Sequence, residues 1–485
     1  MSHQQALEEL QALLGQDDLI TDAAGKRPYE TDGLAAIREV PWVVALPRTR
    51  DAVLGVLAIC RRHRVPIVPR GAGTGLSGGA RPMADGVLLS LARLKRILAI
   101  DVHNGIARVE PGVRNLAISE AVLPHGFFYA PDPSSQIACS IGGNVAENAG
   151  GVHCLKYGLT VHNVCGLVVA TLDGQVHEFG GAGWDPLGLD LRAVTCGSEG
   201  LLGIVLEVVV RLTPLPPEKA VVLAAFSSLG DAGRAVAGII RHGLIPAGLE
   251  MMDHLAIRAA EAFVHAGYPL DAEALLLCEL DGTVGEVSAD LARVEAVMRE
   301  EGAFKLEVAR DPQAQARLWL GRKAAFPAVG RLAPDYYCMD GTIPRGRLAE
   351  VLDEIARMSD EFGLKVANVF HAGDGNLHPL ILYDANNPGE LEKAERFGGR
   401  ILSHCVAVGG AVSGEHGVGV EKLDQMCDQF SAAELAQFER LKAAFDPDGL
   451  LNPGKALPTL TRCVDVGGMH VHANSSARFT RLDRF

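Results

Sequence analysis

The chain has 485 residues, of which 48% are hydrophobic, and it carries a formal net charge of −14. This length exceeds what one hydrophobic core usually serves, so we expect two domains. The acidic balance argues against nucleic acid as a partner, because no basic field is present to neutralise phosphates. Residues 1–20 are acidic and polar, which fits neither a signal peptide nor a transit peptide, and no apolar run is long enough to span a membrane.

The ten cysteines are scattered singly. They form no C-x-x-C pair and no cluster that could by itself bind zinc or an iron–sulfur centre. Such usage is typical of a reducing compartment, so we expect a cytoplasmic protein. Any contact with a membrane would have to come through a partner.

The first predicted elements surround a glycine-rich loop. An amphipathic helix begins at Asp51 and ends in a basic run at residues 61–64, where cations favour a helix C-terminus. Two predicted strands, Val65–Pro69 and Val87–Leu91, flank the loop Arg70-Gly71-Ala72-Gly73-Thr74-Gly75-Leu76-Ser77-Gly78-Gly79.

This loop contains a G-x-G-x-x-G pattern from Gly73 to Gly78. A Rossmann loop must open a helix, whereas this one leads to Arg81-Pro82 and then a strand, so the pattern misleads. The glycines still permit positive φ and gather backbone N–H groups into a nest suited to a diphosphate. Taken alone, the loop is about equally well interpreted as a flexible surface loop.

Two further loops of the same kind follow. One begins at Pro131-Asp132-Pro133-Ser134-Ser135 and continues through Ser140–Asn144 to Asn148–Gly151, and the other, Gly197–Gly200, precedes a predicted strand at Leu202–Leu212. Three Gly/Ser loops are more than chain reversal requires. The small residues of the second loop would let the backbone approach a large planar ligand closely.

The second half of the chain has a different pattern. Pro214-Leu215-Pro216-Pro217 is a plausible domain junction. Beyond it we predict strands and helices by their periodicity, the strands at Ala220–Phe226 and Ala274–Leu280 and the helices at Gly285–Glu301 and Arg345–Phe362. Near the C-terminus, His470 and His472 have strand spacing and are interpreted as surface residues.

A β-hairpin is predicted where two apolar runs, Val366–Phe370 and Leu380–Tyr383, flank Asp374-Gly375. A turn centred there would place His371 directly opposite His378, with Cβ atoms roughly 5 Å apart on one face of the ladder.

An imidazole pair at that spacing could bind one metal ion, and Glu415 in Ser413-Gly414-Glu415-His416-Gly417 could complete a three-ligand site for zinc, manganese or iron. His416 would lie beside the metal without being a ligand. The alternative is a buried, hydrogen-bonded histidine pair. Four polar groups in two glycine-framed loops favour the metal site.

Together, the three loops, the His371 and Glu415 segments and Asn452-Pro453-Gly454-Lys455 resemble the FAD-linked oxidases of the vanillyl-alcohol oxidase type. The resemblance spans about residues 20–460 and is strongest to the flavin subunits of bacterial glycolate oxidases, which are relatives of D-lactate and D-2-hydroxyglutarate dehydrogenases. The runs at residues 132–140 and 336–342 are too long and unusual for chance similarity.

The resemblance implies an α+β fold. A FAD-binding domain of two subdomains would occupy residues 1–217, with its core at about 38–215. An α+β cap domain with an antiparallel sheet would follow at residues 218–457, and a tail at 458–485.

It also implies which residues hold noncovalent FAD, since Thr74 stands where oxidases that tether the flavin carry a histidine. The cofactor-binding set is Pro69, Arg70, Gly71, Ala72, Gly73, Thr74, Gly75, Pro131, Ser134, Ser135, Gly142, Gly143, Asn148, Gly150, Gly151, Glu199, Gly203, Ile204 and Asn452.

The implied reaction is oxidation of a small 2-hydroxy acid, glycolate to glyoxylate or also D-lactate, with one divalent metal ion on His371, His378 and Glu415. His416 would take the hydroxyl proton. Arg322 would clamp the substrate carboxylate through its planar fork. Without the resemblance, Arg322 and Lys323 would be interpreted as a solvated helix face.

The chain has no iron–sulfur, haem or nicotinamide signature, so electrons must leave through another molecule, which is either a partner subunit or a quinone or soluble carrier that the chain reduces directly. The resemblance implies a second FAD-domain subunit and an iron–sulfur subunit, which would make the enzyme peripheral at the inner membrane through its partners. The alternatives are a D-lactate or D-2-hydroxyglutarate dehydrogenase acting alone, a metallohydrolase, and a flavin-binding subunit without catalytic activity.

Overall fold

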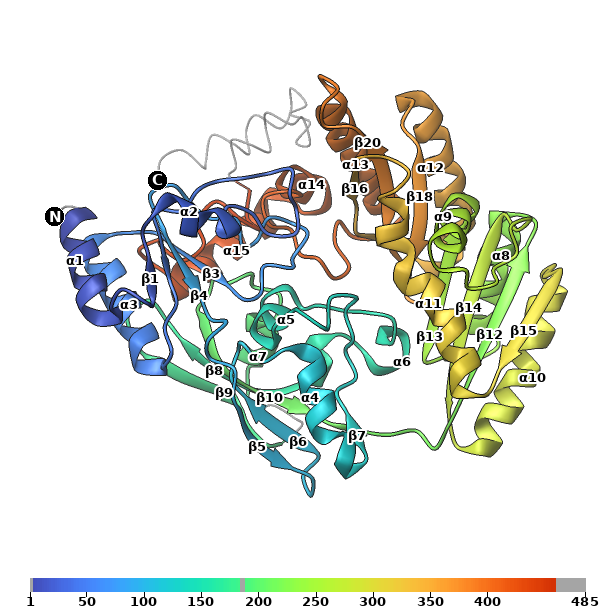
Figure 1. Ribbon diagram of the computed structural model, residues 1–485, viewed down its shortest axis with the longest axis horizontal. Helices are drawn as coiled ribbons and strands as arrows, with labels where there is room; N and C mark the ends of the chain where they lie inside the picture. The colour runs from blue at the N-terminus through green and yellow to red at the C-terminus, as the bar shows by residue number, and fades with distance from the viewer. Residues whose placement is uncertain (1–2, 184–187, 459–485) are drawn as a thin grey trace.

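The computed structural model describes residues 3–183 and 188–458, which form two α+β domains (Figure 1). The tail that carries His470 and His472 lies outside the described residues. The chain passes from the first domain to the second between β11 (Thr213–Pro214) and β12 (Glu218–Phe226), at the proline-rich segment.

The first domain begins with a four-stranded sheet in the order β1-β2-β4-β3, in which β2, β4 and β3 are parallel. Its apolar side packs against two helices, because their buried residues and those of the strands form one cluster. The strands are β1 (Leu19–Ile20), β2 (Val43–Ala45), β3 (Ile67–Arg70) and β4 (Val87–Ser90), and the helices are α1 (His3–Leu14) and α3 (Arg50–His63).

A second, antiparallel sheet of five strands completes this domain in the order β5-β6-β10-β8-β9. Its strands are β5 (Ile97–Asp101), β6 (Ile106–Val109), β8 (Val164–Ala170), β9 (Val176–Gly180) and β10 (Ile204–Arg211). Residues of α4 (Asn115–Val122) and α5 (Ile141–Glu147) cover it in a common core. A short pair, β7 (Phe127–Phe128) with β11, lies beside it.

The second domain is built on a seven-stranded, wholly antiparallel sheet in the order β15-β12-β14-β13-β18-β20-β16. The strands other than β12 are β13 (Gly248–Asp253), β14 (Ala274–Gly282), β15 (Lys305–Ala309), β16 (Asp335–Cys338), β18 (Val366–Phe370) and β20 (Pro379–Tyr383). The predicted antiparallel sheet of the cap is confirmed.

Helices cover both faces of this sheet, so its strands are apolar on both sides. On β12, for example, Val222 packs into one core and the adjacent Val221 into the other. One face carries α8 (Leu229–Arg241), α10 (Val284–Glu300), α12 (Leu348–Phe362) and α13 (Glu390–Ala407), and the opposite face carries α9 (His254–Val264) and α11 (Pro312–Val329).

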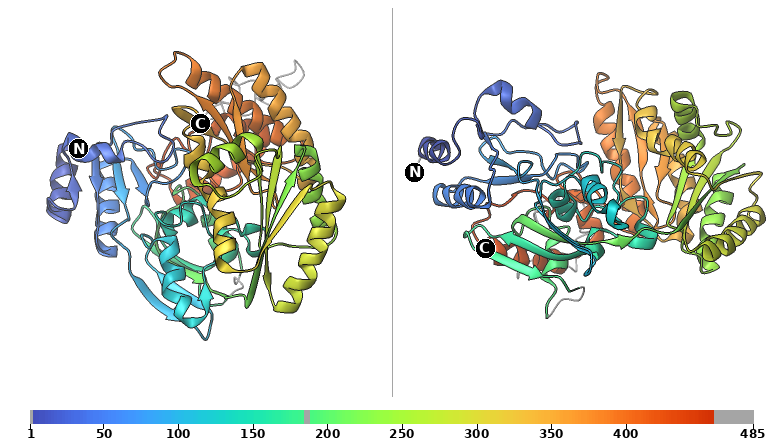
Figure 2. Two further views of the ribbon diagram at one scale, coloured as in Figure 1. Left: turned by 45° about the vertical axis from the view of Figure 1, so that its right-hand side comes forward. Right: turned by 60° about the horizontal axis from the view of Figure 1, so that its bottom comes forward.

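After α13 the chain returns to the first domain through α14 (Leu423–Gln429) and α15 (Ala432–Phe445), as both views in Figure 2 show. The backbone then runs beside β3, where the Ile67 amide donates to the Leu450 carbonyl and the Asn452 amide to the Ile67 carbonyl. From the sequence this segment is expected in the second domain, whereas its buried Leu450 and Leu451 join the core of the first.

No helix in residues 3–183 and 188–458 combines the length and apolar character needed to cross a membrane.

Candidate active site

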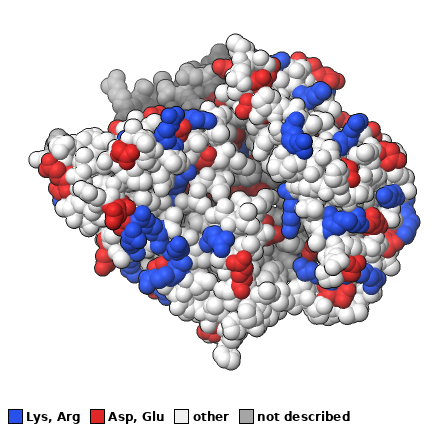
Figure 3. Space-filling model, in the orientation of Figure 1, with Lys and Arg blue, Asp and Glu red and all other residues white. Residues whose placement is uncertain are grey.

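A cavity of about 620 Å³ lies between the two domains. The surface is visibly hollowed there, with acidic and basic side chains interspersed on the face around it (Figure 3). All three glycine-rich loops line the cavity, and so do His378, Glu415 and His416 from the second half of the chain. The structure therefore joins the loops and the histidine segments in one site.

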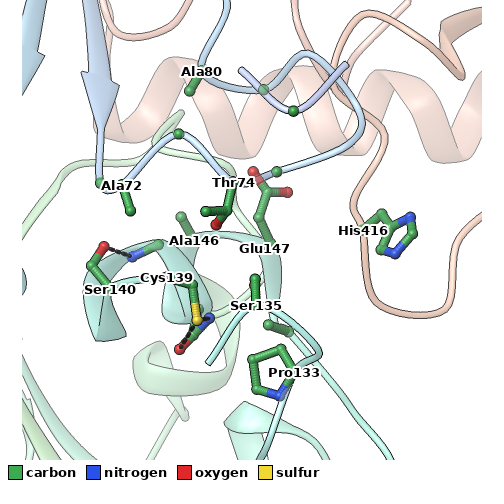
Figure 4. A pocket seen from close by; sticks show the side chains of 18 of the residues that line it. Ala72, Thr74, Ala80, Pro133, Ser135, Cys139, Ser140, Ala146, Glu147 and His416 are labelled. Atoms are coloured by element: carbon green, nitrogen blue, oxygen red, sulfur yellow. Dashed lines mark hydrogen bonds between the residues drawn. The ribbon is translucent and has the colours of Figure 1, made fainter. Parts of the chain in front are cut away.

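Of the residues predicted to hold the cofactor, the lining contains Pro69, Arg70, Gly71, Ala72, Gly73, Thr74, Gly75, Ser134, Ser135, Gly142, Gly143, Glu199, Gly203 and Ile204. Figure 4 shows Ala72 and Thr74 on one side of this space, Ser135 and Pro133 on another, and His416 across from them. Such walls of small residues leave room for a large, flat ligand.

The first loop leaves β3 at Arg70 and runs without a helix, as predicted. Gly73 has φ of 73°, a conformation that favours glycine. The Arg70 guanidinium does not reach outward; it turns back and donates to the Thr31 carbonyl at 2.7 Å. We therefore expect an anion at this loop to be met mainly by backbone N–H groups.

The second loop differs from its prediction. Residues 141–147 form the short helix α5, with Ser140 as its N-cap, because the Ser140 hydroxyl accepts from the Gly143 amide at 3.4 Å. Gly142 and Gly143 are thus helical residues that expose backbone to the cavity, and they do not belong to an extended loop.

Five predicted cofactor residues are not among the lining residues within the described part of the chain, and each has another position. The Pro131 carbonyl accepts from Asn115, and Asn148 is the left-handed C-cap of α5. Gly150 packs against Glu415, and Gly151 packs against the Asp132 backbone. Asn452 donates to the Gly79 and Glu199 carbonyls.

The hairpin register was predicted wrongly. His371 pairs with Asn376, and Asn368 with Pro379, so the strands are offset by two residues from the predicted pairing. The cause is a four-residue turn in which the Gly375 amide donates to the His371 carbonyl, in place of a two-residue Asp374-Gly375 turn. An offset of two keeps every side chain on the same face, so His378 becomes a diagonal neighbour of His371.

Both imidazoles nevertheless converge on Glu415. Their ring centroids are 5.1 Å apart, and the Glu415 Oε1 atom lies 3.4 Å from His371 Nε2 and 3.0 Å from His378 Nε2. Neighbouring ligands around an ion with bonds of about 2.1 Å lie about 3.0–3.4 Å apart. The spacing of the predicted trio is that of a metal centre, and one ligand atom from each residue lies within 4.8 Å of the others.

The Nδ1 atoms of the two histidines, on the side of each ring away from Glu415, support the same conclusion. His371 Nδ1 lies 2.8 Å from Glu250, and His378 Nδ1 lies 3.3 Å from the Met339 carbonyl. Acceptors on both Nδ1 atoms favour the tautomer whose Nε2 lone pair points at Glu415, and such partners are characteristic of metal-binding histidines. Without an ion, burial disfavours a charge on His371, but Glu250 and Glu415 hold its pKa well above the usual range, so its Nε2 atom would carry a proton toward Glu415. A divalent ion would take the place of that proton, and the donor set therefore fits a divalent metal.

A second group of possible ligands, Cys338, His378 and His416, shares His378 with the first. Burial holds the pKa of the Cys338 thiol well above its usual range, which disfavours the thiolate that a metal requires. The imidazoles of His378 and His416 stack almost parallel, 4.8 Å apart, so their in-plane lone pairs do not converge well. Of the two groups, the first trio therefore fits a metal ion better.

His416 lies at the cavity wall with its Nε2 atom 3.8 Å from Glu415 Oε1. Burial lowers its pKa to about 4, although Asp340 acts in the opposite direction. The imidazole is therefore neutral near pH 7 and able to accept a proton.

Arg322, from α11, is 3% exposed and lines the cavity, so it is not part of a solvated face. Its Nη2 atom is 2.6 Å from Glu250 Oε2, while Nε has no hydrogen-bond partner among the described residues. The guanidinium is thus anchored at one end and keeps a donor for a ligand.

Glu250 was missed by the sequence analysis, although it contacts both His371 and Arg322. The available signal was an acidic residue inside the apolar strand Leu249-Glu250-Met251-Met252. Burial opposes its charge, but His371 and Arg322 hold the pKa of its carboxyl below the usual value. Phe326, which lies one helical turn from Arg322 and packs its ring 6.4 Å from that of His378, was missed as well.

Two family models match the chain, an FAD binding domain over residues 41–180 and the C-terminal domain of FAD linked oxidases over residues 215–456. Glycolate oxidase subunit GlcD of Escherichia coli (strain K12) is 60% identical over 94% of this chain and 92% of its own length. D-lactate dehydrogenase of Anaerostipes hadrus is 31% identical over 86% of this chain and 89% of its own.

Among solved structures, p-cresol methylhydroxylase has the same fold, with a TM-score of 0.80 at 19% identity over 94% of this chain and 97% of its own. The match of both domains and the extent of the GlcD similarity agree with the site geometry. The chain belongs to the FAD-linked oxidases of the vanillyl-alcohol oxidase type, in the branch that contains glycolate oxidase subunit GlcD.

Proposed function

We propose that this protein oxidises small 2-hydroxy acids, above all glycolate to glyoxylate, as the flavin subunit of a glycolate oxidase. The observation that carries the proposal is the shared cavity, since His378 and Glu415 of the proposed metal trio, together with His416, line the same space as the FAD-binding loops. The 60% identity to a glycolate oxidase subunit supports glycolate over longer acids. A metallohydrolase would leave the FAD binding domain without a role.

FAD, bound noncovalently, supplies the hydride acceptor. The backbone of residues 70–75 would hold its diphosphate, and the small residues of the second loop and α5 would lie against its ring. Thr74 has no nucleophilic nitrogen with which to tether the ring.

One divalent ion on His371, His378 and Glu415 would bind the substrate hydroxyl and lower its pKa. The chain's own contribution is to hold the three ligand atoms ready, with Glu250 and the Met339 carbonyl fixing the two imidazoles.

His416 would take the hydroxyl proton at Nε2, the nitrogen on the side of Glu415. It is uncharged near pH 7, as a proton acceptor must be, although a pKa of about 4 makes it a weaker base than an ordinary histidine. Arg322 would bind the substrate carboxylate through the donors that Glu250 leaves free.

The word "subunit" in the name of the E. coli relative supports a multi-subunit assembly. We propose that a second FAD-domain subunit and an iron–sulfur subunit accept the electrons.

The decisive experiment is anaerobic mixing of the purified, metal-loaded flavoprotein with glycolate, D-lactate and D-2-hydroxyglutarate while flavin absorbance is followed. Glycolate should bleach the flavin with the highest second-order rate constant of reduction, and D-lactate should be comparable or weaker. Faster reduction by D-2-hydroxyglutarate than by glycolate would overturn the substrate assignment. Absence of reduction by all three acids would overturn the proposed function.

A further inference from the structure

Three separate parts of the chain meet at one carboxylate that the mechanism does not use. Asp340 follows β16 within the unusual run Tyr336–Thr342 and is fully buried, at 0% exposure. The neighbouring residues 341–342 form strand β17, which pairs with β19 (Asn376–Leu377) of the hairpin and bridges to Ala411 on the other side. Asp340 therefore lies between the hairpin that carries His371 and His378 and the loop that carries Glu415 and His416.

The loop wraps its backbone around this carboxylate. The amides of Gly414, Glu415 and His416 all point at Asp340, and the His416 amide donates to Oδ2 at 2.9 Å. The Ser413 hydroxyl donates to the same Oδ2 atom at 2.6 Å. Because the backbone faces inward, the side chains of Glu415 and His416 are left to reach the cavity.

The other Asp340 oxygen binds the hairpin. Asn376 Nδ2 donates to Oδ1 at 2.8 Å, and the Asn376 carbonyl accepts from the His371 amide. A displacement of Asp340 would thus move the His371 side of the metal site relative to Glu415.

A buried cation neutralises the carboxylate and anchors the far end of the loop. Lys422 is also 0% exposed, and its Nζ atom lies 2.9 Å from Asp340 Oδ2 and 2.9 Å from the Gly417 carbonyl. Burial disfavours the charge on Asp340, but the Lys422 ammonium holds the pKa of that carboxyl well below its usual range.

We propose that Asp340 is the positioning residue of the metal centre, and that its hydrogen bonds to the 413–417 loop and to Asn376 set the affinity for the ion and the placement of His416. This inference rests on the proposed metal site, but it does not depend on which 2-hydroxy acid is the substrate.

The test is Asp340→Asn in the full-length flavoprotein, with Zn²⁺ affinity measured by competition with a chromogenic chelator. The Asn side chain has the same shape as Asp, but its NH₂ group is a donor and would face some of the backbone N–H groups that donate to Asp340. Loss of a residue that orients metal ligands typically lowers metal affinity about 10–100-fold, and we expect that fall with FAD stoichiometry unchanged. At saturating Zn²⁺, kcat for glycolate should also fall while KM changes little.

Asp446→Asn is the matched control. Asp446 is likewise buried, accepts from Lys442 Nζ and from the Leu450 and Leu451 amides, and lies in the segment that packs on the first domain. We expect this variant to lose stability without losing Zn²⁺ affinity.

Zn²⁺ affinity of Asp340→Asn within twofold of wild type would overturn the inference, and so would equal losses of FAD, Zn²⁺ and thermal stability in both variants. If Asp340→Asn does not fold, Ser413→Ala removes the hydroxyl that donates to the same carboxylate and accepts from the Gly417 amide, and it should weaken Zn²⁺ binding roughly 2–10-fold. An unchanged affinity there would overturn it equally. A wild-type protein that binds no Zn²⁺ at all would instead contradict the proposed metal site.

Discussion

At the scale of single residues, the hydrogen-bond or ion-pair partner of each buried polar atom determines how the site is arranged. Glu250 accepts from His371 Nδ1 with one oxygen and pairs with Arg322 through the other, so a single buried carboxylate aligns the metal side and the carboxylate-binding side of the cavity. The proposed base His416 lies 3.8 Å from Glu415, whereas the proposed substrate anchor Arg322 pairs with Glu250, so we expect changes at these two residues to have separable kinetic effects.

We expect His416→Ala to retain FAD and metal but to slow flavin reduction by glycolate, since loss of a positioned base typically costs about 10²–10⁴ in rate. Arg322→Lys should mainly raise KM, because an ammonium cannot reproduce a forked contact made in both ground and transition states. Anaerobic stopped-flow measurements separate the two effects. His103→Ala, at an exposed turn, serves as the control. An unaltered reduction rate in the His416 variant would remove that residue from the mechanism.

At the scale of secondary structure elements, the proposed metal site depends on a close approach of the 413–417 loop to the hairpin and to β17. Asn376, fixed by Asp340, lies directly against Gly414, where an added Cβ atom would be 1.5 Å from its Nδ2 and 2.8 Å from Thr342 Cγ2. Only glycine allows the loop to pass at this distance.

Gly414→Ala should therefore destabilise the fold by about 1–3 kcal/mol, as overpacking of a tight interior does, and should also lower metal content. Gly285→Ala is the matched control, because a Cβ at that position in α10 meets nothing within 4 Å. Chemical denaturation and metal analysis of both variants provide the measurement. Wild-type stability and metal content in Gly414→Ala would contradict the close packing described here.

At the scale of the whole molecule, the two domains are joined across a buried charge cluster. His153, next to α6 (Cys154–Tyr157) of the first domain, lies 2.8 Å from Asp132 through Nδ1 and 3.2 Å from Glu279 of β14 through Nε2. Burial disfavours its charge, but the two carboxylates outweigh burial and raise the pKa of His153 to about 10.

Because this pKa is raised from an ordinary value of 6.5, the contact contributes its full stabilisation below about pH 6.5 and loses it as the pH rises toward 10. We expect the melting temperature of wild type to fall between pH 7 and pH 10 more steeply than that of His153→Gln, whose amide does not titrate. Thermal unfolding across this pH range measures the difference, with His103→Ala as a control. Parallel pH profiles for wild type and His153→Gln would refute the assignment.

The sequence by itself determined those features of the protein that local residue patterns encode. Alternation and helical periodicity located β12, β14, α10 and α12, and the proline-rich segment marked the passage between domains. The glycine-rich loops and the histidine and glutamate segments identified the family and predicted the metal trio, because residue type and spacing are themselves the signal for such sites.

The tertiary structure alone decided the features that depend on contacts between distant segments. The hairpin register followed from a four-residue turn, and Glu250 and Asp340 became part of the site only through folding that brings residues 250, 340, 371 and 415 together. The return of residues 450–452 to β3 is likewise a pairing across nearly the whole chain. Local sequence carries little information on such pairings, because their free energy comes from burial and hydrogen bonds that exist only once the chain is folded.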